Sequence, residues 1–442
     1  MQAIEVFLTG RIWIKQFVPF PEEQVQAAID KGHVKVVSGI SADGECARCL
    51  EKSPDYVIPF QCARCGEVCH YCRRCIKMGR ISSCTELVLW TAPAPSKAAP
   101  RAFGWAGNLT LLQENASKAI SGSIREEQDH LLYAVCGAGK TEILFLPIHE
   151  ALQRGMRICV AAPRTDVILE LSPRFHQAFP DAAIHTLYGD SPEQSGYGEI
   201  VLATTHQLYR FQEAFDLLFV DEADAFPYSL DPSLERAVKK AAKPSAPVIY
   251  ISATPSKTLR KQIAGHSTIF RRYHGAPLPV PAYRALWNYE RQIRKGKIPP
   301  PLKGWIEDKL RKKQPFLLFF PSIQLIGQAY PLLRQIDPRI ESVHANDPQR
   351  KEKVMQLREG TLSGLATSTI LERGITIPHL QVAVIGADHP VFDRAALIQI
   401  AGRVGRSAKD PTGDVVFFHD GITRQMDAAR QDILFYNKEE KA

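Results

Sequence analysis

Short apolar runs alternate with amphipathic segments along most of the chain after residue 105. In the first half, the runs that predict buried strands are residues 131–135, 158–162, 200–204, 217–220 and 248–252. Segments such as 166–175 and 234–241 lie between them and repeat their apolar residues at helical spacing. This alternation of strand and helix is typical of a parallel sheet with right-handed crossovers.

A second series of the same kind extends from about residue 315 to the end of the chain. Its predicted strands are residues 316–320, 341–343, 364–366, 382–385 and 414–418. The helices predicted between them include residues 325–335, 348–357 and 395–403. Two such series predict an α/β protein with two tandem lobes, each built on a parallel sheet. We place the first lobe at residues 105–277 and the second at residues 278–442.

The region before residue 105 has a different pattern, which predicts a small α/β unit at residues 1–45, a cysteine-rich module at 46–90 and a linker at 91–104. The elements expected in the first unit are a strand within 4–14, a helix at 22–31 and a strand at 34–37. The linker is rich in Ala and Pro, and Pro can neither continue a helix nor donate to a sheet. After it, residues 109–119 predict a helix entered through Thr110.

The composition of the 442 residues fits a globular protein, with 45% hydrophobic and 23% charged residues. No apolar run approaches the roughly 20 residues that span a bilayer. The first residues lack the basic start and long apolar stretch of a secretory signal. We therefore expect a cytoplasmic protein.

The net charge of +8 is unevenly distributed. Residues 46–84 hold seven Lys/Arg against three Asp/Glu, and residues 284–313 hold ten against three. Local positive excess favours a polyanion partner, because neutralising phosphates releases condensed counterions. The alternative is that these charges only keep the surface solvated.

Eight of the ten cysteines fall within 39 residues, namely Cys46, Cys49, Cys62, Cys65, Cys69, Cys72, Cys75 and Cys84. In a reducing compartment such clustering indicates metal thiolates and not disulfides. Two Cys-x2-Cys pairs complete a tetrahedral zinc site, so eight thiols could hold one or two zinc ions. The spacing does not assign the pairing, an iron–sulfur cluster is the competing chemistry, and His70 is an additional candidate ligand.

Basic residues are interleaved with these cysteines, and Tyr71 lies among them. Together they could grip phosphates and stack on bases, which predicts contact with DNA. A purely structural module that docks on a protein surface is the alternative.

A phosphate-binding loop is predicted where the run 131–135 meets the next helix. The loop residues and the helix start are Cys136, Gly137, Ala138, Gly139, Lys140, Thr141 and Glu142. The two glycines let backbone N–H groups turn toward phosphate oxygens at a helix N-terminus. We expect Lys140 to contact the β- and γ-phosphates of ATP and Thr141 to bind Mg²⁺. The strict pattern has Gly at position 134, where this chain has Ala.

Polar residues follow other predicted strands of the first lobe. Asp221 and Glu222 come after 217–220, residues 252–254 (Ser-Ala-Thr) end the run 248–252, and Thr205 follows 200–204. Ligand sites in parallel sheets gather at the carboxyl ends of the strands. We expect Asp221 to hold Mg²⁺ and Glu222 to activate the attacking water.

The second lobe carries Gln399-x2-Gly402-Arg403-x-Gly405-Arg406 at the end of the predicted helix 395–403. Two arginines three apart on a helix share one face, from which both could reach a γ-phosphate. Each glycine costs a helix about 1 kcal/mol, which indicates a need for close approach to another part of the chain.

These motifs resemble motifs I, II, III and VI of the superfamily 2 helicases, in that order, over about residues 105–425. The resemblance implies two RecA-like lobes with ATP and Mg²⁺ bound between them, and a catalytic set of Lys140, Asp221, Glu222, Gln399, Arg403 and Arg406. It also implies an adenine-reading role for Gln113 and, within a motif V-like stretch, a nucleotide contact by Gly374. The DNA contacts that it implies are Pro163, Arg164, Thr204, Thr205 and Thr367.

The cysteine-rich module placed before this core, with the run 71–80 (YCRRCIKMGR), resembles the ComFA family of late-competence DNA-uptake ATPases. The resemblance implies an ATP-dependent single-stranded DNA translocase that drives import of transforming DNA. It implies a peripheral place at the inner face of the membrane, held there by partners. Those partners are the competence proteins ComFC and DprA and the channel ComEC; a homo-oligomer is left open.

Two other functions are alternatives to a role in DNA uptake. In primosomal, PriA-like replication-restart helicases the cysteines interrupt the second lobe, whereas residues 278–442 contain no cysteine. A non-catalytic zinc adaptor on a decayed motor core is the other alternative, and the intact Lys140, Asp221, Glu222 and Arg406 disfavour it.

Overall fold

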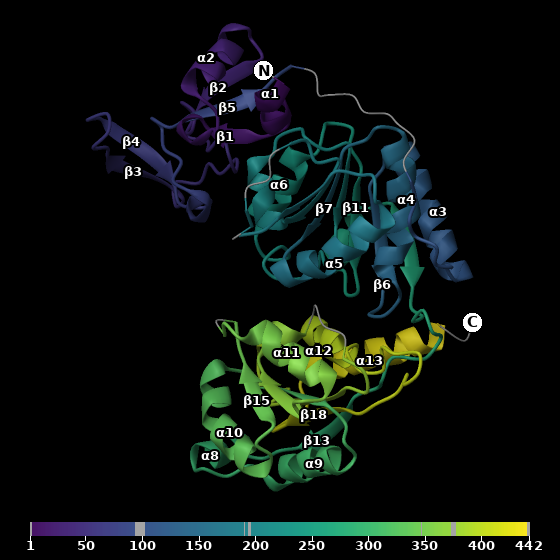
Figure 1. The fold of residues 1–442 in the computed structure, drawn as a ribbon. Helices are drawn as coiled ribbons and strands as arrows, with labels where there is room; N and C mark the ends of the chain where they lie inside the picture. Colours follow the sequence, from purple (N-terminus) through teal and green to yellow (C-terminus); the bar gives the residue numbers. More distant parts are fainter. Residues whose placement is uncertain are drawn as a thin grey trace. The chain divides into compact units, whose positions relative to one another are not determined.

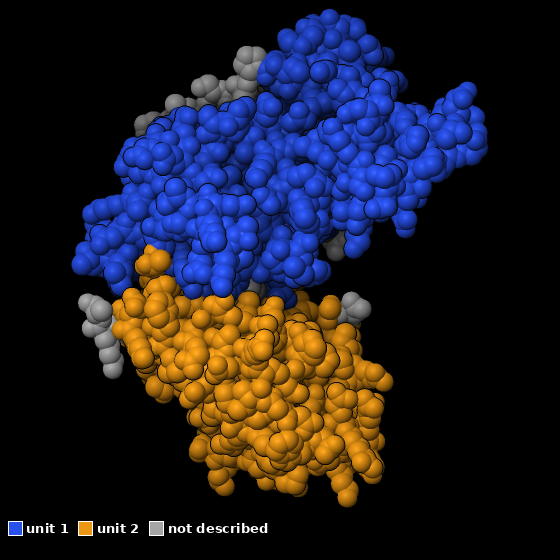
Figure 2. Space-filling view, turned by 180° about the vertical axis from the view of Figure 1, so that it is seen from behind, with its two compact units in different colours: residues 1–133, 141–267 blue, residues 134–140, 268–442 orange. Residues whose placement is uncertain are grey.

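The computed structural model of the chain describes residues 2–92, 102–189, 191–192, 196–345, 347–372 and 377–439. It divides into two compact units, coloured separately in Figure 2. Unit 1 comprises Met1–Tyr133 and Thr141–Ser267, and unit 2 comprises Ala134–Lys140 and Thr268–Ala442. The boundary thus passes through the predicted phosphate loop, and each unit is described separately below.

The N-terminal part of unit 1 is a three-stranded antiparallel sheet with strand order β1-β5-β2. Its elements are α1 (Gln2–Leu8), β1 (Ile12–Ile14), η1 (Lys15–Phe17), α2 (Glu22–Asp30), β2 (Val34–Ser38) and β5 (Glu86–Trp90). The sequence predicts a strand within residues 4–14. The strand β1 covers only Ile12–Ile14, and the residues of this range up to Leu8 form the helix α1 instead. Ile4, Phe7 and Leu8 recur at helical spacing and are all buried on one side of α1.

The cysteine-rich segment is inserted between β2 and the central strand β5. It folds into an antiparallel hairpin, β3 (Val57–Gln61) and β4 (Val68–Cys72), followed by the short η2 (Ile76–Met78). No element in this segment was predicted, because the cysteines interrupt the apolar periodicity on which such predictions depend.

The first lobe, within unit 1, contains a seven-stranded sheet with strand order β12-β6-β11-β10-β7-β9-β8. Figure 1 labels β6, β7 and β11 of this sheet. The strands are β6 (His130–Ala134), β7 (Ile158–Ala162), β8 (Ile184–Leu187), β9 (Ile200–Thr204), β10 (Leu217–Val220), β11 (Val248–Ser252) and β12 (Gly265–Ile269). The helices are α3 (Leu111–Arg125), α4 (Lys140–Gln153), α5 (Thr165–Ala178), η3 (Thr205–Arg210), α6 (Pro232–Ala241) and α7 (Lys257–Gln262). From β6 to β8 along this order, neighbouring strands are parallel, as predicted.

Four strands of this sheet, β7, β9, β10 and β11, have the bounds expected from sequence. Every residue in them is buried, so each one is a continuous apolar run that is easy to recognise. The strands β8 and β12 were not predicted. Their residues alternate between buried and more exposed positions and include polar side chains.

The second lobe, within unit 2, contains a six-stranded parallel sheet with order β13-β18-β17-β14-β16-β15. The strands are β13 (Ala282–Ala285), β14 (Phe316–Phe319), β15 (Ile340–Val343), β16 (Gly364–Thr367), β17 (Gln381–Ile385) and β18 (Val415–His419). The helices are α8 (Tyr289–Arg294), α9 (Pro300–Arg311), α10 (Ile323–Ile336), α11 (Arg350–Glu359), η4 (Thr369–Leu371), α12 (Arg394–Ala401) and α13 (Arg424–Glu439). Within the described residues, no helix combines the length and apolarity needed to cross a membrane.

The N-terminal part packs on the first lobe through a buried arginine. Arg157 is 2% exposed, and its guanidinium donates to the carbonyls of Thr9, at 2.9 Å, and Gly198, at 3.0 Å. The Gly10 carbonyl also accepts a hydrogen bond from the amide of Gln212. A Cβ at Gly10 would lie 2.6 Å from the Cβ of Ala214, so the two backbones meet where only glycine fits. The expected small N-terminal unit is therefore joined directly to the lobe.

Candidate nucleotide site and metal centre

The predicted phosphate loop joins β6 to α4 with the backbone that its glycines allow. Gly137 and Gly139 have φ angles of +84° and +71°, which residues with a Cβ rarely adopt. Two backbone hydrogen bonds hold the loop within unit 2, from Val135 to the Ile269 carbonyl (3.0 Å) and from Tyr273 to the Gly137 carbonyl (2.9 Å). Lys140 is the first residue of α4, so the loop leads directly into a helix N-terminus.

An arginine that sequence reasoning missed contacts the residues after the loop. Arg174, on α5, donates to the Thr141 hydroxyl at 3.2 Å and forms an ion pair with Glu142. The hydroxyl expected to bind Mg²⁺ is thus hydrogen-bonded to a cation in this structure. Nothing in the sequence singles out Arg174, because the contact depends on how α5 packs beside α4.

The acidic motif lies directly after β10 and is tied to the Ser-Ala-Thr motif after β11. The carboxylate of Asp224 accepts hydrogen bonds from the hydroxyls of Ser252 (2.7 Å) and Thr254 (2.6 Å). Asp221 accepts a hydrogen bond from the amide of Glu222 at 2.8 Å, and Glu222 has a left-handed backbone with φ of 52°. This turn holds adjacent carboxylates at fixed positions at the sheet edge.

The phosphate loop and the two polar motifs follow strands that are neighbours in the sheet. The strand β11 pairs with β6 on one side and with β10 on the other, in parallel. The carboxyl ends of parallel strands lie at one edge of a sheet, so the loop after β6 and the two motifs share that edge. The parallel pairing of β6, β11 and β10 is the strand arrangement that the expected common edge requires.

The glycine–arginine turn, defined here as residues 402–406, follows α12. The prediction that the helix extends to residue 403 is wrong, because α12 ends at Ala401 and Gly405 has a φ of +67°. Arg403 is 2% exposed and donates to the Glu372 carbonyl at 2.6 Å, whereas Arg406 is half-buried and donates to the Gly402 carbonyl at 3.1 Å. The arginines therefore belong to a tight turn and not to one helix face.

The side chain of Gln399 is buried and accepts a hydrogen bond from the Cys136 thiol at 2.7 Å. A Cβ at Gly402 would lie 2.6 Å from the Cβ of Cys136, which explains the glycine as the close approach expected from the sequence. All three residues belong to unit 2.

The remaining predicted site residues have other surroundings. Gln113 forms a capping box with Thr110 at the start of α3, so its amide oxygen already serves the helix end. Arg164 is the N-cap residue of α5 and forms an ion pair with Asp166 at 3.7 Å, directly after Pro163.

The three threonines expected to contact DNA, Thr204, Thr205 and Thr367, are at most 7% exposed. Gly374 lies outside the described residues. The roles of these residues toward nucleotide and DNA stay predictions.

The eight clustered cysteines form two groups of four. The inner site comprises Cys46, Cys49, Cys72 and Cys75, and the outer site comprises Cys62, Cys65, Cys69 and Cys84. Neighbouring sulfurs are 3.4–3.8 Å apart. Four sulfurs at about 2.3 Å from one zinc lie roughly 3.8 Å from each other, so each group fits a tetrahedral ion. The pairing that spacing left open is therefore assigned, and His70 belongs to neither group.

In each group hydrogen bonds favour the thiolate form of at least one cysteine, whereas hydrogen bonds with neighbouring thiols, together with burial, raise the pKa of Cys46, Cys49 and Cys69. Amide groups of Cys65 and Arg64 donate to Cys62 and lower the pKa of its thiol to about 6. Hydrogen bonds from neighbouring thiols, and the nearby positive charge of Arg48, lower the pKa of Cys75. The guanidinium of Arg48 lies 3.2 Å from the Cys75 sulfur. The sulfur–sulfur distances allow both sites to hold zinc as closed structural centres.

The inner site is packed against the first lobe. Its four cysteines share a hydrophobic core with residues of η3 and α6, including Tyr209 and Ala241. Lys240 donates to the carbonyls of Arg48 (2.6 Å) and Tyr209 (3.0 Å), and burial lowers the pKa of its ammonium group to about 8. By contrast, Cys65 of the outer site is exposed.

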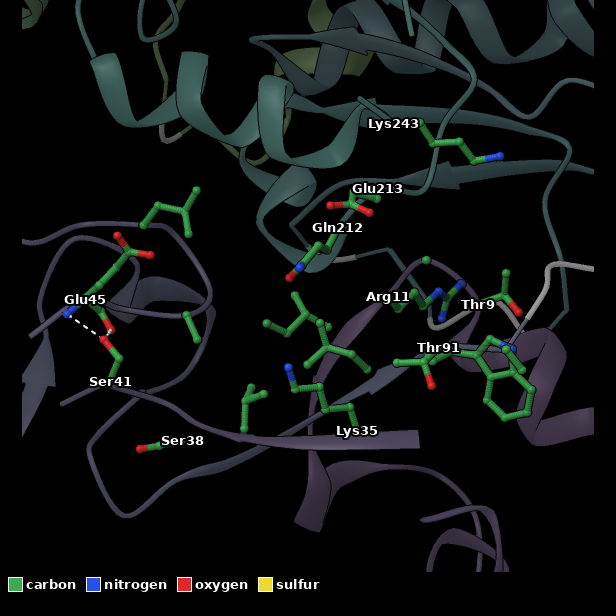
Figure 3. A pocket seen from close by; sticks show the side chains of 18 residues that line it. Thr9, Arg11, Lys35, Ser38, Ser41, Glu45, Thr91, Gln212, Glu213 and Lys243 are labelled. Carbon is green, nitrogen blue, oxygen red and sulfur yellow. Dashed lines mark hydrogen bonds between the residues drawn. The ribbon is translucent and has the colours of Figure 1, made fainter. Parts of the chain in front are cut away.

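A cavity of about 730 Å³ lies between the N-terminal sheet, the start of the cysteine segment and the lobe. Figure 3 shows Lys35 and Thr91 on the side of the N-terminal strands, with Gln212, Glu213 and Lys243 on the opposite wall. Both signs of charge line it, and none of the predicted site residues does.

Three protein families match this chain in succession. The competence protein ComFA N-terminal domain matches residues 1–89, the DEAD/DEAH box helicase domain matches residues 110–262, and the helicase conserved C-terminal domain matches residues 302–408. The helicase domains imply ATP, Mg²⁺ and nucleic-acid binding.

Among curated proteins, the chain is 40% identical to the competence protein ComFA of Bacillus subtilis, over 99% of this chain and 96% of that protein. It is 38% identical to ComFA of Streptococcus pneumoniae, over 84% of this chain and 86% of that protein. Among solved structures, Dbp5 of S. cerevisiae bound to RNA and ADP BeF3 is similar in fold. The TM-score is 0.54 at 14% identity, covering 74% of this chain and 92% of that one.

The order of motifs, the two parallel-sheet RecA-like lobes and the cysteine clusters before them agree with these matches. The two ComFA proteins each match most of the chain. The chain belongs to the ComFA family of competence proteins and carries the domains of a superfamily 2 helicase-type ATPase.

Proposed function

We propose that this protein is an ATP-dependent translocase that moves single-stranded DNA during the import of transforming DNA. The observation that carries the proposal is the common sheet edge, where the phosphate loop, Asp221 and Glu222 follow neighbouring parallel strands. Transfer of a phosphoryl group to water requires contacts to the phosphates, a ligand for the metal and a carboxylate that activates the water. The phosphate loop, Asp221 and Glu222 are proposed to supply these three parts.

In the proposed reaction, Lys140 contacts the β- and γ-phosphates, and Thr141 and Asp221 hold Mg²⁺. Mg²⁺ supplies charge neutralisation on the phosphates when it is bound. Glu222 would accept a proton from the water that attacks the γ-phosphorus, while the bond from that phosphorus to the bridging oxygen breaks and ADP leaves. Arg403 and Arg406 stabilise the charge that develops on the transferred group, which can be worth about 10³–10⁵ in rate for such arginines. Closure of the lobes on ATP and opening after hydrolysis would move the DNA.

Mg²⁺ and the Arg174 cation would both act on the same hydroxyl, that of Thr141. We propose that Arg174 releases Thr141 when the metal arrives, because the ion pair with Glu142 gives its guanidinium an alternative partner. Gln113 would contact adenine with its amide nitrogen, because the amide oxygen is used in the capping box.

The DNA would be held by residues of both lobes and by the cysteine segment. Arg164 and the backbone beside the buried threonines are the contacts proposed for the lobes. On the cysteine segment, Phe60 packs edge-on against Tyr71, with ring centroids 5.4 Å apart, and Arg80 lies 5.2 Å from the Phe60 ring. Aromatic rings beside guanidinium groups suit unpaired bases and their phosphates.

We further propose a cytoplasmic protein at the inner face of the membrane, held there by ComFC, DprA and ComEC. Two zinc ions per chain are proposed, one in each cysteine site.

The test is ATP hydrolysis by the purified protein with and without single-stranded DNA. We expect hydrolysis that single-stranded DNA stimulates, and a loss of about 10²-fold or more in Lys140→Ala, because removing one preorganised contact to developing charge has that effect. Lys118→Ala is the matched control, since Lys118 is an exposed lysine of the first lobe that pairs with Glu114.

Unchanged turnover in Lys140→Ala would refute the assignment of the site. Nucleotide binding without hydrolysis at any DNA concentration would favour the non-catalytic adaptor instead. Movement along the strand is tested separately, with single-stranded DNA that carries biotin and streptavidin at one end. We expect the protein to displace the streptavidin with ATP and not with ADP.

A further inference from the structure

A segment that follows the first-lobe sheet contacts both the phosphate loop and the glycine–arginine turn. We call it the connector and define it as residues 269–275. Its backbone is hydrogen-bonded to the phosphate loop at two places, through the Ile269 carbonyl and the Tyr273 amide. The connector, residues 134–140 and the glycine–arginine turn all belong to unit 2. None of the motifs recognised in the sequence includes the connector.

The side chain of Arg272 extends from the loop to the turn. It is 2% exposed, and its Nη1 donates to the Gly405 carbonyl at 2.5 Å. At the other end, a Cβ placed on Gly137 would lie 3.5 Å from the Arg272 Cγ and 3.6 Å from its Cδ. His274 adds a second contact to the Gly405 oxygen, at 3.1 Å from its Nε2.

Both glycines that Arg272 touches have left-handed backbones, with φ of +84° at Gly137 and +67° at Gly405. A Cβ on Gly405 would lie 3.0 Å from the Arg272 Nη1. The arginine therefore lies against one glycine of each of the two nucleotide motifs.

A second contact joins the same two motifs independently of Arg272. The Cys136 thiol donates to Gln399, and Gly402 packs against the Cys136 Cβ. The loop and the turn are thus joined on two sides, so a displacement of one must displace the other.

We infer that Arg272 is a positioning residue for ATP hydrolysis, which holds the glycine–arginine turn against the phosphate loop so that Arg403 and Arg406 are placed when the loop binds phosphates. This inference rests on the proposed function. A buried guanidinium is costly unless it is hydrogen-bonded. The Nη1 of Arg272 donates to the Gly405 carbonyl, and its methylene groups pack beside Gly137, so one side chain contacts the backbone of both motifs. Through Gly405 the arginine acts on Arg406, the next residue, without contacting the nucleotide itself.

The test compares Arg272→Met with Arg272→Lys. Methionine keeps the methylenes beside Gly137 but cannot donate to Gly405, whereas lysine keeps the stem, the charge and one donor. We expect Arg272→Met to lower kcat about tenfold or more with the KM for ATP within about threefold, and Arg272→Lys to recover most of kcat. Arg271→Met is the control, because Arg271 is adjacent and exposed.

A readout without hydrolysis separates this inference from the proposed function. Alkylation of Cys136 in the nucleotide-free protein, followed by peptide mass mapping, reports the contact of the loop with the turn, since the thiol is only 5% exposed there. We expect faster alkylation in Arg272→Met than in Arg272→Lys and Arg271→Met.

If the wild type hydrolyses no ATP, the proposed function fails, while the alkylation result still decides whether Arg272 joins the two motifs. A wild-type kcat in Arg272→Met would overturn the inference. An equal loss of kcat in the Met and Lys variants, with equally lowered melting temperatures, would overturn it as well, because that pattern indicates a role in folding alone.

Discussion

Glu51 connects the cysteine segment to the first lobe. One of its carboxylate oxygens accepts from Arg74 at 3.1 Å and from Arg236, on α6, at 2.8 Å. The Arg74 guanidinium also stacks on Tyr56, 3.5 Å from the ring centroid. With 9% of its side chain exposed, Glu51 is a nearly buried carboxylate whose charge is balanced by two arginines.

Glu51→Gln should lower the melting temperature at pH 7 by a few degrees, because removing a buried charge from its partners costs about 1–2 kcal/mol. Burial raises the pKa of Glu51, but the Ser53 amide, Arg74 and Arg236 lower it overall below its ordinary value of 4.5. The stabilisation is therefore present above pH 4.5 and is lost as the pH falls through the lower pKa of the folded protein.

Scanning calorimetry of both proteins from pH 7 to pH 4 measures this difference, with Glu67→Gln, an exposed glutamate of the same segment, as the control. A gap in melting temperature that stays constant below pH 4.5 would contradict the role of the Glu51 charge.

Individual site residues differ in how far the sequence predicts them. Roles for Lys140, Asp221 and Glu222 are predicted because each residue is embedded in a short local pattern at the end of an apolar run. Arg174 and Arg272 could not be predicted, since each is defined by contacts with residues 32 to 135 positions away in the chain. A single arginine outside a motif has the same appearance in the sequence whether it is buried or solvated.

The two cysteine sites are elements of unequal burial, which has a measurable consequence. The inner site shares a hydrophobic core with the first lobe, whereas the outer site is carried by the tip of the β3–β4 hairpin and has an exposed ligand, Cys65. Loss of metal from the inner site should therefore expose lobe surface, and loss from the outer site should not.

Elemental analysis of the wild type should give two zinc ions per chain, and one in each of Cys49→Ser and Cys65→Ser. Cys49→Ser should lower the melting temperature by several degrees more than Cys65→Ser, because structural zinc contributes directly to folding free energy. Iron in place of zinc, or equal destabilisation by both variants, would be inconsistent with this assignment.

The accuracy of the predicted elements follows burial. Strands buried on both faces, such as β7 and β10, could be placed to the residue. Three parts of the chain could not be predicted, namely the hairpin of the cysteine segment, β12 and α8. Their apolar residues recur with neither the strand period nor the helix period over a sufficient length. Turns set by tertiary contact, such as the one after α12, also differ from their sequence prediction.

At the scale of the whole molecule, the surplus of positive charge is concentrated in two regions that the structure distinguishes. On α9, Arg311 and Lys312 pair with Asp308, at 2.7 and 2.9 Å, and Lys303 lies 3.8 Å from Glu307. These three cations are therefore paired with two carboxylates, those of Glu307 and Asp308. On the cysteine segment, Arg73, Lys77 and Arg80 are exposed beside the aromatic pair Phe60 and Tyr71.

We therefore expect the affinity for single-stranded DNA to depend on salt mainly through the cysteine segment. Replacing Arg73, Lys77 and Arg80 together with Gln should reduce the slope of log K against log salt concentration by about 2, since each neutralised phosphate of a single strand contributes about 0.7. Fluorescence anisotropy over a salt series measures the slope.

The matched control replaces Lys303, Arg311 and Lys312 with Gln, which should leave the slope unchanged. If instead the α9 variant alone changes the slope, the DNA is bound on the second lobe and the cysteine segment has a structural role.

The buried contact of the inner cysteine site with η3 and α6 also limits how the segment can be exchanged in evolution. A cysteine module that is joined to its neighbour only by a flexible linker can be transferred between proteins as a unit, because it needs no matching surface. Here residues such as Glu51 and Arg48 meet Arg236 and Lys240 across the contact, so a transplanted segment would need a matching helix on the recipient. The two surfaces should therefore be inherited together, and chimaeras between distant relatives should function only when both are exchanged.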